Sequence, residues 1–163
     1  MRKYIAFIIL FICFTTQSQE EKEELKVYSF NEIEKLNKQI PKPIVVFIHT
    51  DWCKYCFAMK KNTFNNNEVI KALNDKFYFV FLNAESKKDI TFLNHTFKYK
   101  PTGNNTGVHQ LANELAGIKN RISYPTTTIL NSKFEIDILK NGYINSKKML
   151  FILKKYNTTY SNF

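Results

Sequence analysis

The sequence predicts an α/β fold in which helices flank a central mixed β-sheet. Ile44–Ile48 and Phe77–Leu82 are uninterrupted apolar runs, which is the composition of strands buried on both faces. A stretch with helical spacing separates them, so we expect two parallel strands joined by a right-handed crossover. Nearer the C-terminus, Thr126–Leu130 and Phe134–Leu139 flank a tight turn at Asn131–Ser132, which indicates two further strands.

Length and composition favour one packed domain. The chain has 163 residues, enough for a sizeable core, and it combines 15 phenylalanines and nine tyrosines with only four glycines. That composition argues against a disordered chain. We expect residues 26–163 to form the domain and residues 19–25, which are rich in Glu, to be a flexible lead-in.

Residues 1–18 have the pattern of a secretory signal peptide. Two basic residues precede the apolar run Tyr4–Phe14, and small polar residues follow it, so we expect cleavage before Gln19. The run is too short to span a bilayer comfortably, which argues against an uncleaved anchor, and Cys13 would leave with the peptide. The sequence therefore predicts an exported protein, periplasmic or otherwise extracytoplasmic, without a stable membrane span.

The charge of the expected mature chain is basic but dispersed. Without residues 1–18, which hold two of the 24 basic residues and none of the 14 acidic ones, 22 basic residues remain and the net charge is +8. The lysines are scattered through every expected element, and no arginine cluster or aromatic ladder forms a groove. This pattern favours a solvated basic surface and argues against a nucleic-acid-binding protein.

The first elements are short. Lys26–Phe30 is expected to form a first strand. Ser29 and Glu32 have the spacing of a capping box, which predicts a helix that continues to about Lys38, where two prolines soon break the chain. After the strand Ile44–Ile48, a second helix is expected to begin at Cys53.

Two helices are expected between the apolar strands. The one that begins at Cys53 should reach about Thr63, and Asn66 or Asn67 is available to cap the next. The apolar stripe of this next helix consists of Val69, Ile70 and Leu73.

The region after the second apolar strand is harder to interpret. The apolar residues Ile90, Phe92, Leu93 and Phe97 suggest some helix. Lys98–Gly107, with its proline and two glycines, is expected to be an exposed loop. His109–Leu115 has helical spacing and is stopped by Gly117.

The C-terminal elements show clearer periodicity. In Phe134–Leu139, apolar residues at positions 134, 136 and 138 alternate with acidic ones, as in a strand with one wet face. A last helix capped by Asn145 or Ser146 should pack against the sheet through Met149, Leu150, Ile152 and Leu153.

The chemistry of the chain concentrates in Cys53 and Cys56, a C-x-x-C pair that follows Trp52 at the end of an apolar strand. If a helix begins at Cys53, the first sulfur lies over the helix N-terminus, where unpaired amides favour the thiolate, and Lys54 adds a positive charge nearby. Cys56 lies on the same helix face and can close a disulfide. The pattern predicts a reactive, redox-active pair.

Other uses of the two cysteines fit the sequence less well. A structural zinc site needs two further ligands at short spacing, and His49 and His109 do not make a convincing set. Phe57 follows Cys56, so the haem-attachment pattern is absent. A purely structural disulfide would close a very short loop and remove little chain entropy. No bound cofactor is expected.

Several segments together resemble the thioredoxin superfamily. Lys42–Cys56 resembles its strand-to-helix active site, Asn66–Ile70 the segment after the active-site helix, Ser123–Thr126 its cis-proline loop, and Gly142 its terminal glycine. The likeness includes exported thioredoxin-like proteins such as the C-terminal domain of the transmembrane disulfide reductase. It extends over nearly the whole expected mature chain and implies the thioredoxin fold.

The resemblance also implies roles for residues. Cys53 would be the attacking nucleophile and Cys56 the resolving thiol. Trp52 would shield the sulfur, and Pro125 would be a cis-proline facing the cysteines, preceded by Tyr124, which is bulkier than the usual residue there. These positions, with Lys54 and Tyr55 between the cysteines, are the expected substrate-binding and supporting residues. Compact thioredoxins have less sequence at Asp89–Gly107, which is therefore expected to be an insertion that shapes partner choice.

The chain departs from the family at the buried Asp and Lys that assist proton transfer from the resolving thiol. Phe47 and Phe81 stand at the corresponding positions. An apolar lining raises the cost of a Cys56 thiolate, and His49 or a water is a candidate substitute. Lys54-Tyr55 matches neither the Gly-Pro of reducing thioredoxins nor the Pro-His of the strong periplasmic oxidase.

These observations predict an exported thiol-disulfide oxidoreductase, a reductant or isomerase-like donor rather than a primary oxidase. Its partners would be protein thiols and disulfides and an electron-donating redox protein, and we expect a monomer. Two other hypotheses stay open: a binding or chaperone module with an inert disulfide, whose function would survive loss of Cys53, and a thiol-based metal carrier.

Overall fold

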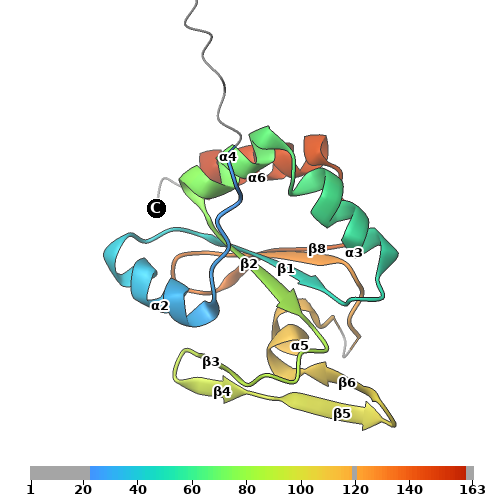
Figure 1. Cartoon of the computed structure of the whole chain (residues 1–163). Helices are drawn as coiled ribbons and strands as arrows, with labels where there is room; N and C mark the ends of the chain where they lie inside the picture. The colour runs from blue at the N-terminus through green and yellow to red at the C-terminus, as the bar shows by residue number, and fades with distance from the viewer. Residues whose placement is uncertain (1–22, 119–120, 161–163) are drawn as a thin grey trace, which may run out of the picture.

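The computed structural model describes residues 23–118 and 121–160, which are built around a four-stranded mixed sheet (Figure 1). The strand order is β2-β1-β7-β8, with β1 parallel to β2 and antiparallel to β7, and β8 antiparallel to β7. The predicted α/β fold with a mixed sheet is confirmed. The strands are β1 (Ile44–His49), β2 (Tyr78–Asn83), β7 (Thr126–Leu130) and β8 (Ile136–Asn141).

Helices cover both faces of the sheet, as Figure 1 shows. A longer helical layer lies on one face, and two helices cover the other. The first layer contains α3 (Lys54–Ala58), the π-helical turn η2 (Met59–Thr63), α4 (Asn67–Lys76) and α6 (Ser146–Tyr160). The second contains α2 (Phe30–Gln39) and α5 (Gln110–Ala116).

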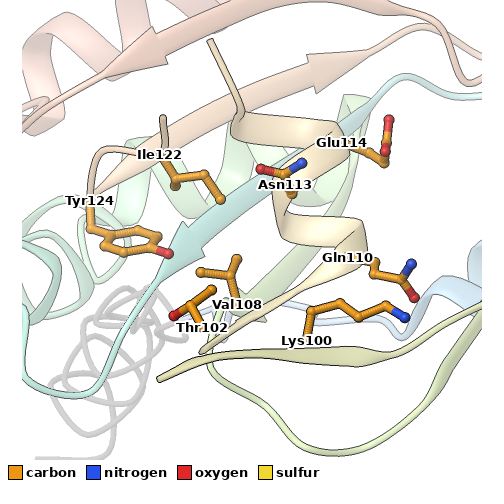
Figure 2. A pocket seen from close by; sticks show the side chains of 8 residues that line it. All are labelled: Lys100, Thr102, Val108, Gln110, Asn113, Glu114, Ile122 and Tyr124. Atoms are coloured by element: carbon orange, nitrogen blue, oxygen red, sulfur yellow. The ribbon is translucent and has the colours of Figure 1, made fainter. Parts of the chain in front are cut away.

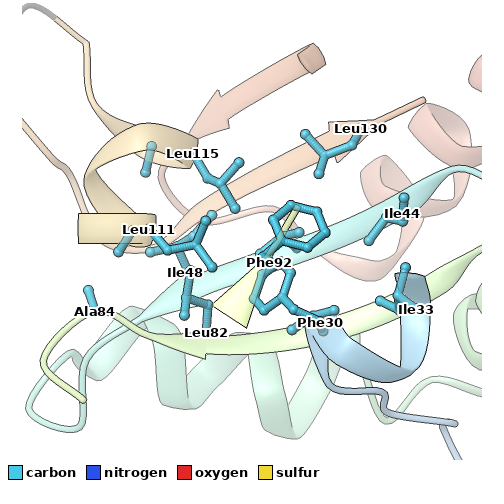
Figure 3. Packing of buried hydrophobic residues seen from close by; sticks show 14 of the residues in the cluster. Phe30, Ile33, Ile44, Ile48, Leu82, Ala84, Phe92, Leu111, Leu115 and Leu130 are labelled. Atoms are coloured by element: carbon cyan, nitrogen blue, oxygen red, sulfur yellow. The ribbon is translucent and has the colours of Figure 1, made fainter. Parts of the chain in front are cut away.

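The core is divided by β1, whose six residues are all buried. Alternate side chains enter opposite layers, as the period of a strand requires. Ile44 and Ile48 pack with α2 and α5 (Figure 3), whereas Val45 and Phe47 pack with α3, η2, α4 and α6. The cysteine pair belongs to the side of the core that α3, η2, α4 and α6 cover.

Three helix starts agree with the predicted caps. Ser29 and Glu32 form the capping box of α2. Where the sequence left two candidates, Asn66 caps α4, and Asn145 accepts a hydrogen bond of 2.9 Å from an amide in the first turn of α6. Side-chain caps of this kind satisfy amides that would otherwise lack a partner.

The predicted first strand at Lys26–Phe30 is wrong. Its one backbone hydrogen bond to the sheet runs from the Tyr28 amide to the Phe79 carbonyl of β2, at 2.9 Å. Because Ser29 already caps α2, the helix begins too soon for a ladder to form. The segment leads the chain past the β2 edge without extending the sheet.

The insertion differs most from expectation. The helix suggested around Ile90 is absent, and the loop expected at Lys98–Gly107 is largely a hairpin. Leu93, Asn94 and Asn105 have positive φ and turn the chain without glycine. Two hairpins result: β3 (Ile90–Phe92) with β4 (His95–Phe97), and β5 (Tyr99–Gly103) with β6 (Thr106–His109).

The strand β8 is shifted relative to the predicted Phe134–Leu139. Phe134 has a φ of 68° and lies in the turn, and the register shifts near Leu130. As a result Phe134 packs against the α2 layer and Ile138 against the opposite layer, while Ile136 is exposed. The predicted single inward face of this strand is therefore wrong.

The predicted signal peptide, residues 1–18, lies outside the described residues, as does Cys13. Within residues 23–118 and 121–160, no helix has the length and apolar character needed to cross a bilayer.

Candidate active site

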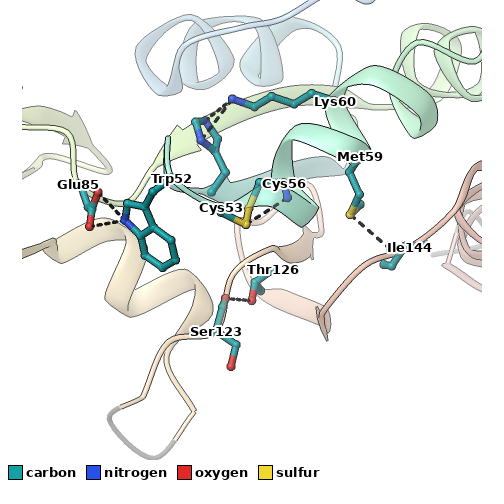
Figure 4. Close-up of a disulfide and its surroundings, with 10 residues drawn as sticks. Trp52, Cys53, Cys56, Met59, Lys60, Glu85, Ser123, Thr126 and Ile144 are labelled. Carbon is teal, nitrogen blue, oxygen red and sulfur yellow. Dashed lines mark hydrogen bonds between the residues drawn. A yellow bond between two sulfur atoms is a disulfide. The ribbon is translucent and has the colours of Figure 1, made fainter.

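Cys53 and Cys56 form a disulfide at the carboxyl end of β1 (Figure 4). Their Cα atoms are 5.2 Å apart. Cys53 retains 6% of its surface exposed and Cys56 only 1%. Cys53 is therefore the less buried of the two cysteines.

The turn that follows β1 places the Cys53 sulfur at the start of a helix. The backbone amide of Cys53 donates to the Thr50 carbonyl at 3.4 Å, which closes the turn. Cys53 then caps α3: its sulfur accepts a hydrogen bond of 3.1 Å from the Cys56 amide, and its carbonyl accepts the first helical bond, from Phe57. Amides of the first helical turn and the helix dipole therefore favour negative charge on this sulfur.

Asp51 lies in the turn before α3 but does not cap this helix. The cap is Cys53, and the Asp51 carboxylate instead accepts a hydrogen bond of 3.0 Å from the side-chain amide of Asn83, at the end of β2. Because β1 and β2 are parallel, their carboxyl ends meet at one edge, and this bond joins the two loops that leave it.

Trp52 is exposed by 66% and is held on both sides. Its indole N–H lies 3.0 and 3.1 Å from the two carboxylate oxygens of Glu85, and its ring meets that of Tyr124 edge to face, with centroids 5.9 Å apart. Sequence reasoning missed Glu85. Its position just after β2, at the same sheet edge as the cysteines, was the available signal.

The loop before β7 has the geometry that the resemblance implies. The Tyr124–Pro125 peptide bond is cis. The Pro125 carbonyl accepts a hydrogen bond of 2.7 Å from the amide of Gly142, whose φ of 89° is one that glycine adopts readily. The Thr126 hydroxyl donates to the Ser123 carbonyl at 2.7 Å. These bonds hold the loop against the end of β8.

Aromatic side chains surround the cysteines on the outer surface. Tyr55 and Phe57 are each exposed by 68%, and Tyr143 by 42%. The centroids of the Tyr55 and Tyr143 rings lie 6.4 Å apart, so α3 and the loop after β8 share one aromatic surface. Phe57 and Tyr143 were not among the predicted site residues. Lys54 is exposed beside this surface, within the C-x-x-C loop.

An aromatic wall packs in the same core layer as the buried sulfur. Phe47 is fully buried and lies opposite Phe81 in the register of β1 and β2. Phe64 and Phe79 complete the wall, with neighbouring ring centroids between 4.8 and 6.0 Å apart. This wall belongs to the same core layer as Cys56, apart from the less buried Phe81, which packs against it. It offers no charge that could stabilise a thiolate there.

His49 is the ionisable group at the edge of this wall. It is 5% exposed, its ring stacks on Phe47 with centroids 5.9 Å apart, and both of its nitrogens lie 3.1 to 3.3 Å from the Lys60 ammonium. Burial, and then the charge of Lys60, lowers the pKa of His49 to about 4. Burial also lowers the pKa of Lys60. The imidazole is thus neutral at ordinary pH, and its low pKa makes it a weak proton acceptor.

Lys60 was also missed from the sequence. It lies seven residues after Cys53, two helical turns on, and that spacing places it on the helix face that carries the cysteines. Its ammonium also lies 5.2 Å from the centroid of the Phe81 ring.

The described residues hold no group of three or more His, Cys, Asp or Glu side chains that could bind a metal ion. His109, weighed as a zinc ligand, caps α5 instead: one ring nitrogen accepts from the Leu111 amide at 3.2 Å, and the other lies 3.1 Å from the Lys88 carbonyl. His109 therefore has a structural position.

Comparisons with known proteins agree with this geometry. The sequence model of a family described as thioredoxin-like matches residues 27–105. No curated protein sequence matches the chain. The fold is similar to that of a DsbH oxidoreductase, at 16% identity with a TM-score of 0.59, over 89% of this chain and 90% of that one.

Two further solved structures share the fold. A thioredoxin from Thermus thermophilus is 17% identical with a TM-score of 0.59, and the match covers 86% of this chain and 95% of that one. The oxidised C-terminal domain of DsbD from Neisseria meningitidis is 17% identical with a TM-score of 0.52, over 80% of this chain and 98% of that domain. At these identities the likeness establishes the fold.

Proposed function

Because the chain has the thioredoxin fold and a thioredoxin-like family model matches residues 27–105, we propose that it is a protein-disulfide oxidoreductase of the thioredoxin superfamily that exchanges its Cys53–Cys56 pair with protein substrates. The observation that carries the proposal is the placement of Cys53 as the cap of α3, more accessible than Cys56 and bonded to it. A thiolate at a helix N-terminus is stabilised and reactive, and a second cysteine three residues away can displace a trapped partner.

The exchange proceeds in two displacements. The Cys53 thiolate of the reduced protein attacks one sulfur of a client disulfide, forming a mixed disulfide and releasing the other client sulfur as a thiolate. The Cys56 thiolate then attacks the Cys53 sulfur and releases the remaining client sulfur, so the client gains two electrons and the protein regains its disulfide. The steps require no bound cofactor.

We propose the reducing or isomerase-like direction and an extracytoplasmic location, where an electron-donating redox protein would regenerate the dithiol. The signal-peptide pattern of residues 1–18 supports export. Lys54 should stabilise the Cys53 thiolate and make the disulfide somewhat more oxidising than a pair without it. A measured reduction potential of roughly −270 mV would support the proposed reducing role, whereas a potential of roughly −120 mV would indicate an oxidase.

Trapping with a resolving-cysteine variant tests the exchange. In Cys56→Ser, the mixed disulfide at Cys53 has no internal thiol to displace it, so we expect client proteins to accumulate covalently bound and to be released by dithiothreitol. Non-reducing electrophoresis followed by mass spectrometry measures this. The matched control, Cys53→Ser, should trap far less because Cys56 is buried.

The competing hypothesis of an inert binding module makes the opposite prediction. It requires no trapped partner under any redox condition and full function in Cys53→Ser. Either result would overturn the proposed exchange activity.

A further inference from the structure

A pocket of about 520 Å³ opens beside the cis-proline loop, between the insertion and α5 (Figure 2). The β5–β6 hairpin supplies Lys100 and Val108, α5 supplies Gln110 and Asn113, and the chain before β7 supplies Tyr124. The volume lies within the usual range for ligand pockets. The predicted insertion thus forms one wall of a cavity that compact members of the fold would lack.

The pocket is continuous with the active-site surface through one side chain. Tyr124 lines it and also meets the ring of Trp52, the residue before the nucleophile, with centroids 5.9 Å apart. In Figure 2 Tyr124 stands at one side of the pocket, with Lys100 and Gln110 at the other. A chain crossing the cysteines beside Pro125 would therefore reach the pocket as soon as it passed Tyr124.

The lining indicates the class of ligand. Val108, Ile122 and Tyr124 contribute apolar surface. The side-chain amide of Asn113 offers a donor and an acceptor, and Gln110, whose oxygen accepts a hydrogen bond of 2.8 Å from the Lys98 amide, offers its NH₂ group as a donor, so together they complement a peptide backbone. Lys100 and Glu114, which are exposed and opposite in charge, also line the pocket. The lining is therefore neither wholly positive nor wholly negative and would not select an anion or a cation.

We propose that this pocket binds the polypeptide segment next to the target disulfide of a protein client. The inference rests on the proposed exchange activity and deepens it: the insertion gives the enzyme a preference for peptide-borne disulfides over small ones. The chemistry at Cys53 is the same for both substrates, and only the peptide also occupies the pocket.

The test compares two substrates in a variant whose pocket is filled. Asn113 is an exposed position on α5, so Asn113→Trp should block the pocket without disturbing the core. The reduced protein is mixed with a two-cysteine peptide disulfide carrying several flanking residues, or with oxidised glutathione, and the exchange rate is followed by chromatography. We expect the variant to lose roughly tenfold in rate with the peptide, equivalent to the loss of one good side-chain contact, and to keep its rate with glutathione.

The glutathione rate in the same sample reports whether the site is folded and active. Asn62→Trp changes an exposed asparagine in η2 that does not line the pocket; it is the matched control and should match the wild type with both substrates. Equal rates of wild type and Asn113→Trp with the peptide, or equal losses with both substrates, would overturn the pocket proposal. A loss with glutathione alone would also overturn it and assign the pocket to a small thiol. If the wild type exchanges with neither substrate, the proposed function itself fails.

Discussion

The chemistry of this site depends on single side chains in unusual surroundings. Phe47 and its neighbours form an aromatic wall in the same part of the core as Cys56, and two ionisable groups, His49 and Lys60, lie at the wall's edge. Burial, and then the positive charge of the Lys60 ammonium 3.1 Å away, disfavours the protonated form of His49 and lowers its pKa. Burial of a neutral histidine beside a cation makes stability depend on pH.

Stability should therefore fall in mildly acidic solution. The pKa of His49 is about 4 in the folded chain and near 6.5 when unfolded, so between these values the unfolded chain binds the extra proton. The contribution of neutral His49 to the free energy of unfolding is therefore complete above pH 6.5. It is lost as the pH falls towards 4, and the loss is at most about 3 kcal/mol. Urea denaturation of wild type and His49→Gln across this range measures it. Burial lowers the pKa of His109 in the same direction, so only the difference between the two proteins isolates His49. Parallel pH profiles would contradict the prediction.

At the scale of elements, the active-site helix combines a cysteine cap with a following π-helical turn. Helix positions and caps were predictable because Ser29, Asn66 and Asn145 sit at cap positions beside clear apolar stripes. The structure of the insertion was not predictable, because its strands are too short to show the two-residue period of a β-strand. Its turns use Leu93 and Asn94 at positive φ, and a leucine there gives no turn signal.

The residues of the candidate site also differ in whether the sequence could predict them. Cys53, Cys56, Trp52 and Pro125 carry local motifs, and the sequence identified them. Glu85 and Lys60 were marked only by their positions, just after β2 and two helical turns beyond Cys53, and their contacts with Trp52 and His49 depend on which strand ends and helix faces meet in space. The pocket depends on the same tertiary arrangement, and no motif in the sequence marks it.

The charge at the start of α3 should control the thiolate fraction of Cys53. In Lys54→Glu a negative charge replaces a positive one beside a sulfur that the helix amides already favour as an anion, so the thiol–thiolate equilibrium of reduced Cys53 should shift towards the thiol at low ionic strength. Thiolate absorbance of the reduced protein against pH measures the shift, and added salt should shrink it. Lys61→Glu, an exposed lysine farther along the same helical segment, should produce a much smaller change. Equal shifts in both variants would exclude a local effect.

At the scale of the whole molecule, the insertion is part of the core as well as a wall of the pocket. Phe92 of β3 is 4% exposed, and its ring centroid lies 4.9 Å from that of Phe30 in α2 and 5.3 Å from that of Phe134 before β8. Segments from the start, middle and end of the chain therefore meet at one side chain. The insertion cannot be loosened without loosening the α2 layer.

Removing that side chain should destabilise the entire domain. Phe92→Ala leaves a cavity between the insertion and α2 and is expected to cost about 3 to 5 kcal/mol of unfolding free energy. Urea denaturation followed by circular dichroism measures the loss, with Thr91→Ala, an exposed neighbour in β3, as a control expected to change stability by less than about 1 kcal/mol. A similar small effect of both substitutions would mean that the hairpin packs independently of the core.

The position of Trp52 has an optical consequence. It is the only tryptophan in the sequence, it is largely exposed, and it precedes the redox pair directly. A disulfide quenches the emission of an adjacent indole more strongly than two thiols do, so reduction of the pair should brighten the protein. Because the indole N–H bonds to Glu85 and its ring meets Tyr124, docking of a partner on this surface should change the emission as well. The unlabelled protein thus contains one fluorophore whose emission reports both the redox state of the cysteine pair and the binding of a partner.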